Sequence, residues 1–383
     1  MQLQATLPKR PVNATAGAGL ALMLILMMMM MMMLGGCSTA GYYWQSVSGH
    51  MDLLGRARPV SDVLGDAQTP AVLKARLELS QRLRSFAVQE LKLPDNPSYR
   101  RYADLRRPSV VWNVVAAPEF SLALKTWCFA LVGCVSYRGY FDEQQARAEA
   151  DALGKQGLEV SVYGVPAYST LGKLNWLGAI GSDPLLSTFI TYPEGELARI
   201  IFHELAHQVV YAADDTMFNE SFATAVERLG GQRWLTTNAS QAARDEYAVM
   251  DQRRQQFKAL TLTTRRDLAE VYALITPAGQ DKRAQEAGKS IAMMRFKNGY
   301  EELKENWALT AQNTSATTSG YDAWVARANN ASFGAQAAYD ELVPGFEALF
   351  EASGKDWQRF YDAARALAQL PQEQRHEALK TKP

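Results

Sequence analysis

The chain has 383 residues, of which 48% are hydrophobic and 21% are charged, and its 40 basic side chains balance its 40 acidic ones. This length and composition allow one large buried core or two smaller ones. Because there is no surplus of basic side chains to attract phosphate groups, we expect no nucleic-acid partner.

The first 36 residues have the pattern of a bacterial secretory signal. Lys9 and Arg10 precede a long apolar run, and the tetrapeptide Leu34-Gly35-Gly36-Cys37 follows it. Charged, apolar and small residues in this order are typical of a signal peptide. The tetrapeptide resembles a lipobox, which implies cleavage before Cys37 and a lipid on its sulfur. An uncleaved membrane-spanning helix is the alternative, because the apolar run is just long enough to cross a bilayer.

A cellular location follows from this signal. Ser38 comes after the cysteine, where an Asp would resemble a signal for retention in the inner membrane. We therefore expect a protein of the bacterial cell envelope, attached by an N-terminal lipid to the outer membrane and facing the periplasm. Removing residues 1–36 takes away two basic and no acidic residues, so the mature part is slightly acidic.

Residues 37–105 are expected to form a helical lead-in, in which an amphipathic stretch from Ala71 to Leu91 ends before Pro94. Residues 106–232 are expected to form a core in which strand and helix patterns alternate. Strands are predicted for Ser109–Ala116, Val132–Tyr140 and Val160–Tyr163, with a helix over Asp142–Gln156. These segments predict an α+β, mostly helical fold with a small mixed β-sheet and a crossover helix.

Two cysteines, Cys128 and Cys134, remain after the signal, with five residues between them. In an oxidising periplasm such a pair predicts a short-loop disulfide, which contributes roughly 2 kcal/mol by the chain-entropy estimate. A pair of metal ligands is the alternative, but no histidine lies nearby in the sequence.

The motif His203-Glu204-Leu205-Ala206-His207 carries the chemistry of this chain. Residues 196–211 contain no Gly or Pro and are predicted to form one buried helix. On a helix, two imidazoles four residues apart point the same way, and the carboxylate between them can act as a general base. We therefore predict a site for one zinc ion with Glu204 as base. A pair of buried, hydrogen-bonded histidines is the alternative.

A catalytic zinc ion takes three protein ligands and leaves one position open, so a third ligand is required. Residues 218–227 are predicted to form a second helix, ended by Gly230-Gly231, that places Glu220 and Glu227 on one face. We expect Glu220 to bind the metal and Glu227 to accept an imidazole N–H. A carboxylate on the helix surface is the alternative for Glu220. Asp215 either orients a histidine in the same way or caps the second helix.

These residues resemble the gluzincin metallopeptidases, and the aminopeptidase N group in particular, in which H-E-x-x-H is followed by N-E-x-F-A-x-x-x-E. The resemblance implies a zincin-like catalytic core with His203, His207 and Glu220 as ligands and Glu204 as base. Here twelve residues separate His207 from Glu220, where the gluzincin pattern has eighteen, so the turn must be tighter. The chain also has no G-x-M-E-N segment, which in aminopeptidase N relatives helps to hold the substrate's amino group.

Five further segments are similar to a bacterial lipoprotein family named putative or predicted aminopeptidases. They are Gly41–Gln45, Trp112–Ala117, Tyr137–Phe141, Ala167–Gly172 and Asp183–Thr188. This resemblance covers most of the mature chain and implies a peptide substrate, without deciding between cleavage at the amino end and within the chain.

Residues 233–383 are predicted to be nearly all helical, and to form one compact unit with the rest of residues 37–383. The predicted helices are Gln241–Leu260, Thr264–Leu274, Asp281–Trp307, Asp322–Asn329, Leu342–Glu351 and Trp357–Leu370. The polar tail from Gln372 is expected to fray. Asn219 either contacts substrate or stabilises a helix start, and Asn329-Asn330 belongs either to a turn or to the wall of the site.

In the mechanism that this site implies, Glu204 takes a proton from the attacking water and passes it to the leaving nitrogen. The developing oxyanion needs a further donor, for which Tyr168 is our choice, with Tyr140 and Arg138 as alternatives. A strand over Val162–Thr170 is the candidate for pairing with an extended peptide. Two other functions stay open: a binding or chaperone lipoprotein whose zinc only holds two helices together, and a helical scaffold with a fortuitous motif.

Overall fold

The computed structural model describes residues 41–129, 133–172, 178, 181–274, 281–310 and 319–380. Contacts divide the chain into two units, Met1–Met51 and Asp52–Pro383, and the described part of the first unit is helical. The predicted signal and Cys37 lie outside the described residues. Within the described part of the chain, no helix has both the length and the apolarity that crossing a bilayer requires.

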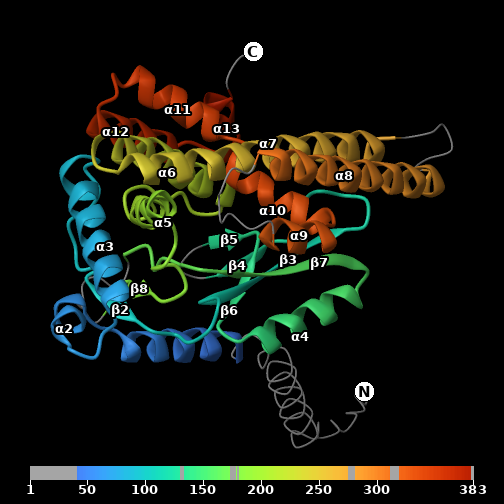
Figure 1. Cartoon of the computed structure of the whole chain (residues 1–383). Helices are drawn as coiled ribbons and strands as arrows, with labels where there is room; N and C mark the ends of the chain where they lie inside the picture. The colour runs from blue at the N-terminus through green and yellow to red at the C-terminus, as the bar shows by residue number, and fades with distance from the viewer. Residues whose placement is uncertain are drawn as a thin grey trace, which may run out of the picture. The chain divides into compact units, whose positions relative to one another are not determined.

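The second unit is an α+β, mostly helical structure, as the sequence predicts, but its described residues form three small sheets where we expected one (Figure 1). The strands are β1 (Arg58–Pro59), β2 (Arg101–Ala103), β3 (Val111–Pro118), β4 (Trp127–Phe129), β5 (Gly133–Val135), β6 (Arg138–Tyr140), β7 (Leu158–Val165) and β8 (Leu185–Leu186). The helices are α2 (Val60–Gly65), α3 (Ala71–Gln89), α4 (Glu143–Gly154), α5 (Glu194–Ala206), α6 (Thr216–Thr237), α7 (Gln241–Tyr272), α8 (Lys282–Thr310), α9 (Ser319–Ala326), α10 (Asn330–Asp340), α11 (Val343–Ala352), α12 (Trp357–Ala368) and α13 (Gln372–Leu379).

The central sheet has the order β6-β3-β7, and both outer strands run antiparallel to the buried strand β3. Helix α4 is the expected crossover, because it joins β6 to β7 on opposite sides of β3. The strand predicted over Val132–Tyr140 is wrong as one element. Its first part, β5, pairs with β4, and its second part, β6, pairs with β3. An apolar pattern shows that a segment is extended but does not show which partner it joins.

Helices α5 and α6 pack against each other in the largest apolar cluster, which also includes side chains of α3, α11 and α12. The prediction that Gly230-Gly231 ends the second helix is wrong, since α6 continues to Thr237. A Cβ atom built on Gly230 would lie 2.6 Å from Leu91 Cδ1 and 3.1 Å from Phe202 Cδ2. The absence of a side chain at this position therefore allows the close approach of α6 to its neighbours.

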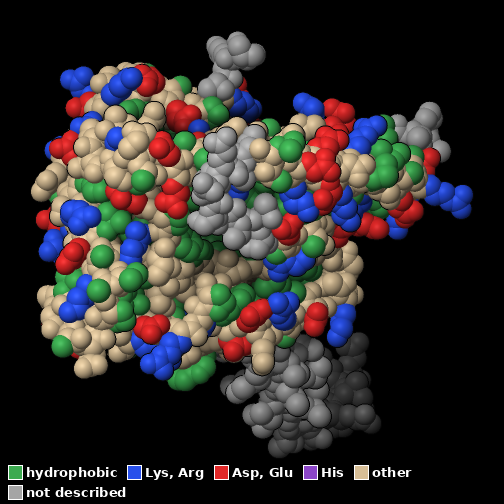
Figure 2. Space-filling view, viewed as in Figure 1, with side chains coloured by type: hydrophobic (Ala, Val, Ile, Leu, Met, Phe, Trp, Pro, Cys, Tyr) green, Lys and Arg blue, Asp and Glu red, His purple; other side chains and the backbone are tan. Residues whose placement is uncertain are grey.

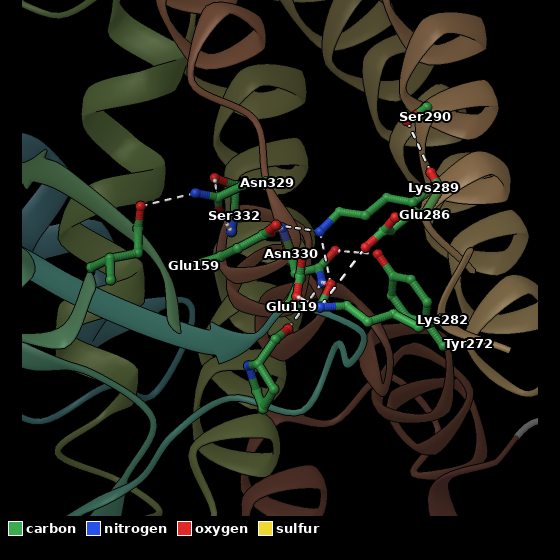
Figure 3. Close-up of polar contacts among 12 residues, drawn as sticks. Glu119, Glu159, Tyr272, Lys282, Glu286, Lys289, Ser290, Asn329, Asn330 and Ser332 are labelled. Atoms are coloured by element: carbon green, nitrogen blue, oxygen red, sulfur yellow. Dashed lines mark hydrogen bonds and ion pairs between the residues drawn. The ribbon is translucent and has the colours of Figure 1, made fainter. Parts of the chain in front are cut away.

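Helices α7 and α8 form a long hairpin, whose surface is crowded with acidic and basic side chains (Figures 1 and 2). The predicted break between Leu260 and Thr264 is absent, and α7 is continuous. A polar cluster attaches the hairpin to the ends of β3 and β7 (Figure 3). Lys289 pairs with Glu159 and donates to the carbonyl oxygen of Glu119 at 2.8 Å.

Asn329 and Asn330 belong to this same polar cluster, so the structure gives both a structural role. Asn329 caps α10, which the sequence did not predict, and its amide donates to Val160 O at 2.9 Å. The Asn330 backbone N–H donates to Glu159 Oε2 at 2.8 Å, and its side-chain oxygen accepts from the Tyr272 hydroxyl at 2.7 Å. These contacts connect the hairpin, the sheet and α10 (Figure 3).

The C-terminal segment does not fray as expected, because it forms α13. Arg375 is buried and donates to the carbonyl oxygens of Ala368 and Leu370 at the end of α12. Leu379 is also buried, and its backbone packs so closely on Gly345 that no Cβ atom would fit there. A polar sequence therefore forms a fixed helix here because one arginine and one leucine attach it to the core.

Candidate metal centre

Helices α5 and α6 bring His203, His207 and Glu220 together at one point. The Nε2 atoms of His203 and His207 lie 3.1 Å apart. Glu220 Oε2 lies 3.3 Å from His203 Nε2 and 3.6 Å from His207 Nε2. Among the described residues, these three form the one group of histidine, cysteine and acidic side chains whose donor atoms are arranged to hold a metal ion.

The arrangement fits a zinc ion by size. A tetrahedral ion with bonds of about 2.0 to 2.2 Å separates its ligand atoms by about 3.3 to 3.6 Å. The three observed separations, 3.1, 3.3 and 3.6 Å, are close to this range. The chemistry of the donors also fits, since two imidazole nitrogens and a carboxylate are common zinc ligands.

Glu227 holds His203 from the side opposite to this point. Its Oε2 atom accepts from His203 Nδ1 at 3.0 Å, and its other oxygen is ion-paired with Arg199. With its proton on Nδ1, the ring directs the Nε2 lone pair toward His207 and Glu220. The structure thus places Glu227 where the sequence suggested, against an imidazole N–H.

The buried charges of this group favour a cation. Burial raises the pKa of Glu220, but His207 and His203 outweigh it and bring that pKa to about 2. Burial likewise raises the pKa of Glu227, but Arg199 and His203 bring it to about 2. Burial lowers the pKa of His203, while its hydrogen bonds with Glu220 and Glu227 raise it well above its usual range. The ionised carboxylate of Glu220 therefore favours positive charge at the point where the three side chains meet, whereas the charge of Glu227 is balanced by Arg199.

Glu204 lies on α5 between the two histidines and is buried. Burial is the largest influence on its pKa and raises it, and the two histidines lower it in part. A carboxylate with a raised pKa accepts and returns protons more readily near neutral pH. The environment of Glu204 is therefore suited to a general base.

Three tyrosines for which the sequence predicted no role interact electrostatically with Glu220. The carboxylate of Glu220 helps to raise the pKa of Tyr137, Tyr163 and Tyr211, although burial is the larger cause in each. The pKa of Tyr163 and that of Tyr211 rise to about 12, so these phenols are protonated donors at neutral pH. Tyr137 also interacts with Glu204. A signal for Tyr137 was present, since it begins one of the five segments that resemble the aminopeptidase family.

The three donors predicted from the sequence come from β6 and from the segment after β7. Tyr168 follows β7, with its ring edge-on to Phe141 at 5.6 Å between centroids. Arg138 and Tyr140 lie on β6, where the guanidinium group is 5.7 Å from the tyrosine ring centroid and 3.2 Å from Glu149. The strand predicted for Val162–Thr170 ends at Val165, and β7 is an outer strand of its sheet.

Asp215 does not orient a ligand histidine, and this part of our prediction is wrong. Its carboxylate caps α6 by accepting from the Phe218 N–H at 3.0 Å, and it binds Arg375 and His376 of α13. Asn219 stabilises the same turn, because its side chain bonds to both the N–H and the carbonyl oxygen of Ala212. Of the alternatives that the sequence left open, Asp215 therefore takes that of helix cap, and Asn219 that of stabilising a helix start.

Cys128 and Cys134 are joined as a disulfide and lie opposite each other in the hairpin of β4 and β5. This hairpin contacts the turn between α5 and α6. The Cys134 N–H donates to Asp214 Oδ1, and the Ser136 N–H donates to Thr216 Oγ1 at 3.4 Å. No feature of the sequence predicted that the cysteine pair would lie beside the turn between α5 and α6.

Comparison with known proteins identifies the family. A family model described as "Putative aminopeptidase" matches residues 41–379, which include α5, α6 and α13. Neither the curated proteins nor the solved structures include a match. Because the family match covers most of the chain, the protein belongs to the putative aminopeptidase family.

Proposed function

We propose that the protein is a zinc-dependent metallopeptidase with a zincin-like catalytic core, which hydrolyses peptide bonds. The observation that carries this proposal is the convergence of His203, His207 and Glu220 within 3.6 Å of one another, with Glu204 between the two histidines on α5. Family membership supports a peptide as the substrate.

In the proposed reaction, different residues bind the metal, transfer the proton and stabilise the oxyanion. Zinc held by His203, His207 and Glu220 would supply a Lewis acid and an acidified water molecule. Glu204 accepts a proton from the attacking water and delivers it to the leaving nitrogen. Tyr137 and Tyr168 are the candidate donors to the oxyanion. The interaction of Tyr137 with Glu220 and Glu204 favours it over our original choice of Tyr168.

A purely structural zinc site is less consistent with this geometry. Structural sites use four protein ligands, whereas three donors converge among the described residues. A structural site also has no use for Glu204, and burying an ionisable carboxylate that binds nothing would only reduce stability. A binding or chaperone lipoprotein, in which zinc only joins two helices, is therefore the second candidate after a metallopeptidase.

The substitution Glu204→Gln tests the proposal. We expect the purified variant to keep one zinc ion per chain, measured by elemental analysis, and to lose at least a hundredfold in peptide hydrolysis. Glu302→Gln, at an exposed position on α8, is the matched control and should behave as wild type. Wild-type protein that holds no stoichiometric zinc, or Glu204→Gln protein that keeps full activity, would contradict the proposal.

A peptide library with free and blocked amino ends then distinguishes two modes of cleavage. The family name favours removal of amino-terminal residues, which requires recognition of a free ammonium group. An aminopeptidase would cleave only the free peptides, whereas an endopeptidase would cleave both sets.

We also propose that a lipid on Cys37 attaches the mature protein to the outer membrane, as the residues before this cysteine suggest. Replacing Cys37 with Ala should release the protein from the membrane fraction into the periplasm. Mass spectrometry of the N-terminal peptide should show the lipid in wild type. An unmodified Cys37 in the membrane fraction would instead favour an uncleaved spanning helix.

A further inference from the structure

The turn that joins α5 to α6 fixes how the third ligand meets the two histidines. His207 is the C-cap of the first helix and Asp215 is the N-cap of the second, with Glu220 about one and a half turns further on. Asp214 has a φ of 64°, in the left-handed region that residues other than glycine adopt at a cost. Because this turn contains a strained residue, contacts with other segments of the chain are needed to stabilise its conformation.

Helix α13 supplies such contacts through Asp215. Arg375 Nη1 lies 2.6 Å from Asp215 Oδ2, and His376 Nε2 lies 2.9 Å from the same oxygen and 3.0 Å from Oδ1. The side chains of Asp215 and Arg375 are only 1% and 7% exposed. The guanidinium carbon of Arg375 also lies 5.0 Å from the ring centroid of Phe218, in the first turn of α6.

Arg375 and His376, the two residues that contact Asp215, differ in their other hydrogen bonds. Arg375 also binds carbonyl oxygens at the end of α12, so it attaches Asp215 to a second helix. His376 is partly exposed, at 22%, and its Nε2 atom bonds to both carboxylate oxygens of Asp215. Changing His376 therefore perturbs the Asp215 carboxylate with less damage to the core than changing Arg375.

We propose that Arg375 and His376 are positioning residues of the metal centre, which act through Asp215 to set the place of Glu220 relative to His203 and His207. The inference rests on the proposed zinc site. Ligand distances in a zinc site tolerate shifts of only about 0.2 Å. The apolar contacts of α6 allow small sliding movements, but the directed bonds to Asp215 define the position of the helix start.

Zinc affinity of the full chain, measured by competition with a chromophoric chelator, tests this inference. We expect His376→Leu to weaken zinc binding by tenfold or more, as loss of an outer contact does in other sites. His376→Gln keeps a donor near the position of Nε2, which contacts Asp215, and should stay within threefold of wild type. Arg375→Met should weaken binding further, with partial rescue in Arg375→Lys. Glu373→Gln, exposed on the same helix, is the matched control.

Cobalt substitution gives a second readout that a merely structural role would not change. The visible absorption of Co²⁺ reports ligand geometry, so the His376→Leu spectrum should differ from wild type and the His376→Gln spectrum should not. The inference is overturned if wild type binds zinc while His376→Leu and Arg375→Met keep its affinity and spectrum. If wild type binds no zinc, the proposed function fails as well. If either His376→Leu or Arg375→Met does not fold, the other variant carries the comparison.

Discussion

Replacing Glu227 with Gln removes one negative charge from a buried group on α5 and α6. In the wild-type structure, Glu227 accepts from His203 Nδ1 at 3.0 Å and pairs with Arg199. The side chains of Arg199 and Glu227 are only 10% and 13% exposed, so water has little access to solvate the Arg199 charge that the substitution leaves unpaired. The other carboxylate that pairs with Arg199 is Glu196, at 3.9 Å, and it is shared with Arg254.

Removing one partner of a buried ion pair costs about 3 to 5 kcal/mol, because the other charge stays buried. Since Gln keeps one oxygen as an acceptor, we expect the lower end of this range, about 3 kcal/mol, for the loss in free energy of unfolding. Urea denaturation in the presence of a chelator measures this loss without a contribution from metal. Zinc affinity should also fall by about tenfold or more, because His203 loses its orienting partner.

The double variant Arg199→Met, Glu227→Gln provides the internal control. It removes the charge that the single change leaves unpaired, so it should recover part of the lost unfolding free energy but not the zinc affinity. A Glu227→Gln protein whose unfolding free energy stays within about 1 kcal/mol of wild type would refute the reasoning. In that case water or another carboxylate compensates Arg199.

Three further changes test other parts of the structure. Gly230→Ala should reduce the free energy of unfolding by about 1 to 3 kcal/mol, because the added methyl group would meet Leu91, and urea denaturation measures the loss. Burial raises the pKa of Asp183 to about 7, so the group is less favourable for folding once ionised. Stability should therefore fall as the pH rises from about 4 to 7, and Asp183→Asn should flatten this decline in pH-dependent melting. Replacing both Cys128 and Cys134 with Ser should cost about 2 kcal/mol of unfolding free energy, and an unchanged melting temperature would contradict the role of the disulfide.

Local pattern predicted most elements that do not depend on distant partners. The helices near Ala71–Gln89, Glu194–Ala206 and Trp357–Ala368 follow from apolar spacing, and α4 follows from its position between two strands. The grouping of His203 and His207 also follows locally, since helix geometry alone places residues four apart on one face. Glu220 was found through a motif that resembles a known family, and the structure brings it to the same point.

The sequence failed where the outcome depended on contacts between distant segments. Gly230 has the character of a helix end, and only the approach of Leu91 and Phe202 shows why α6 continues through it. The polar residues of α13 predict a frayed tail, but Asp215, 160 residues earlier in the chain, holds Arg375 in place. The partners of Asp215 could not be read from the sequence, because a carboxylate at a helix start is equally suited to several roles.

The sequence by itself predicted the helical and strand character of most segments, because this character arises from neighbours a few residues apart. It also singled out the two histidines, Glu204 and Glu220 as candidates for a metal site. Only the tertiary structure decided how α5 and α6 meet, which tyrosines interact electrostatically with Glu220 and what holds the turn between the two helices. Those features depend on contacts between separate segments, such as Asp215 and Arg375, which lie 160 residues apart, and a single sequence carries no periodic signal for them.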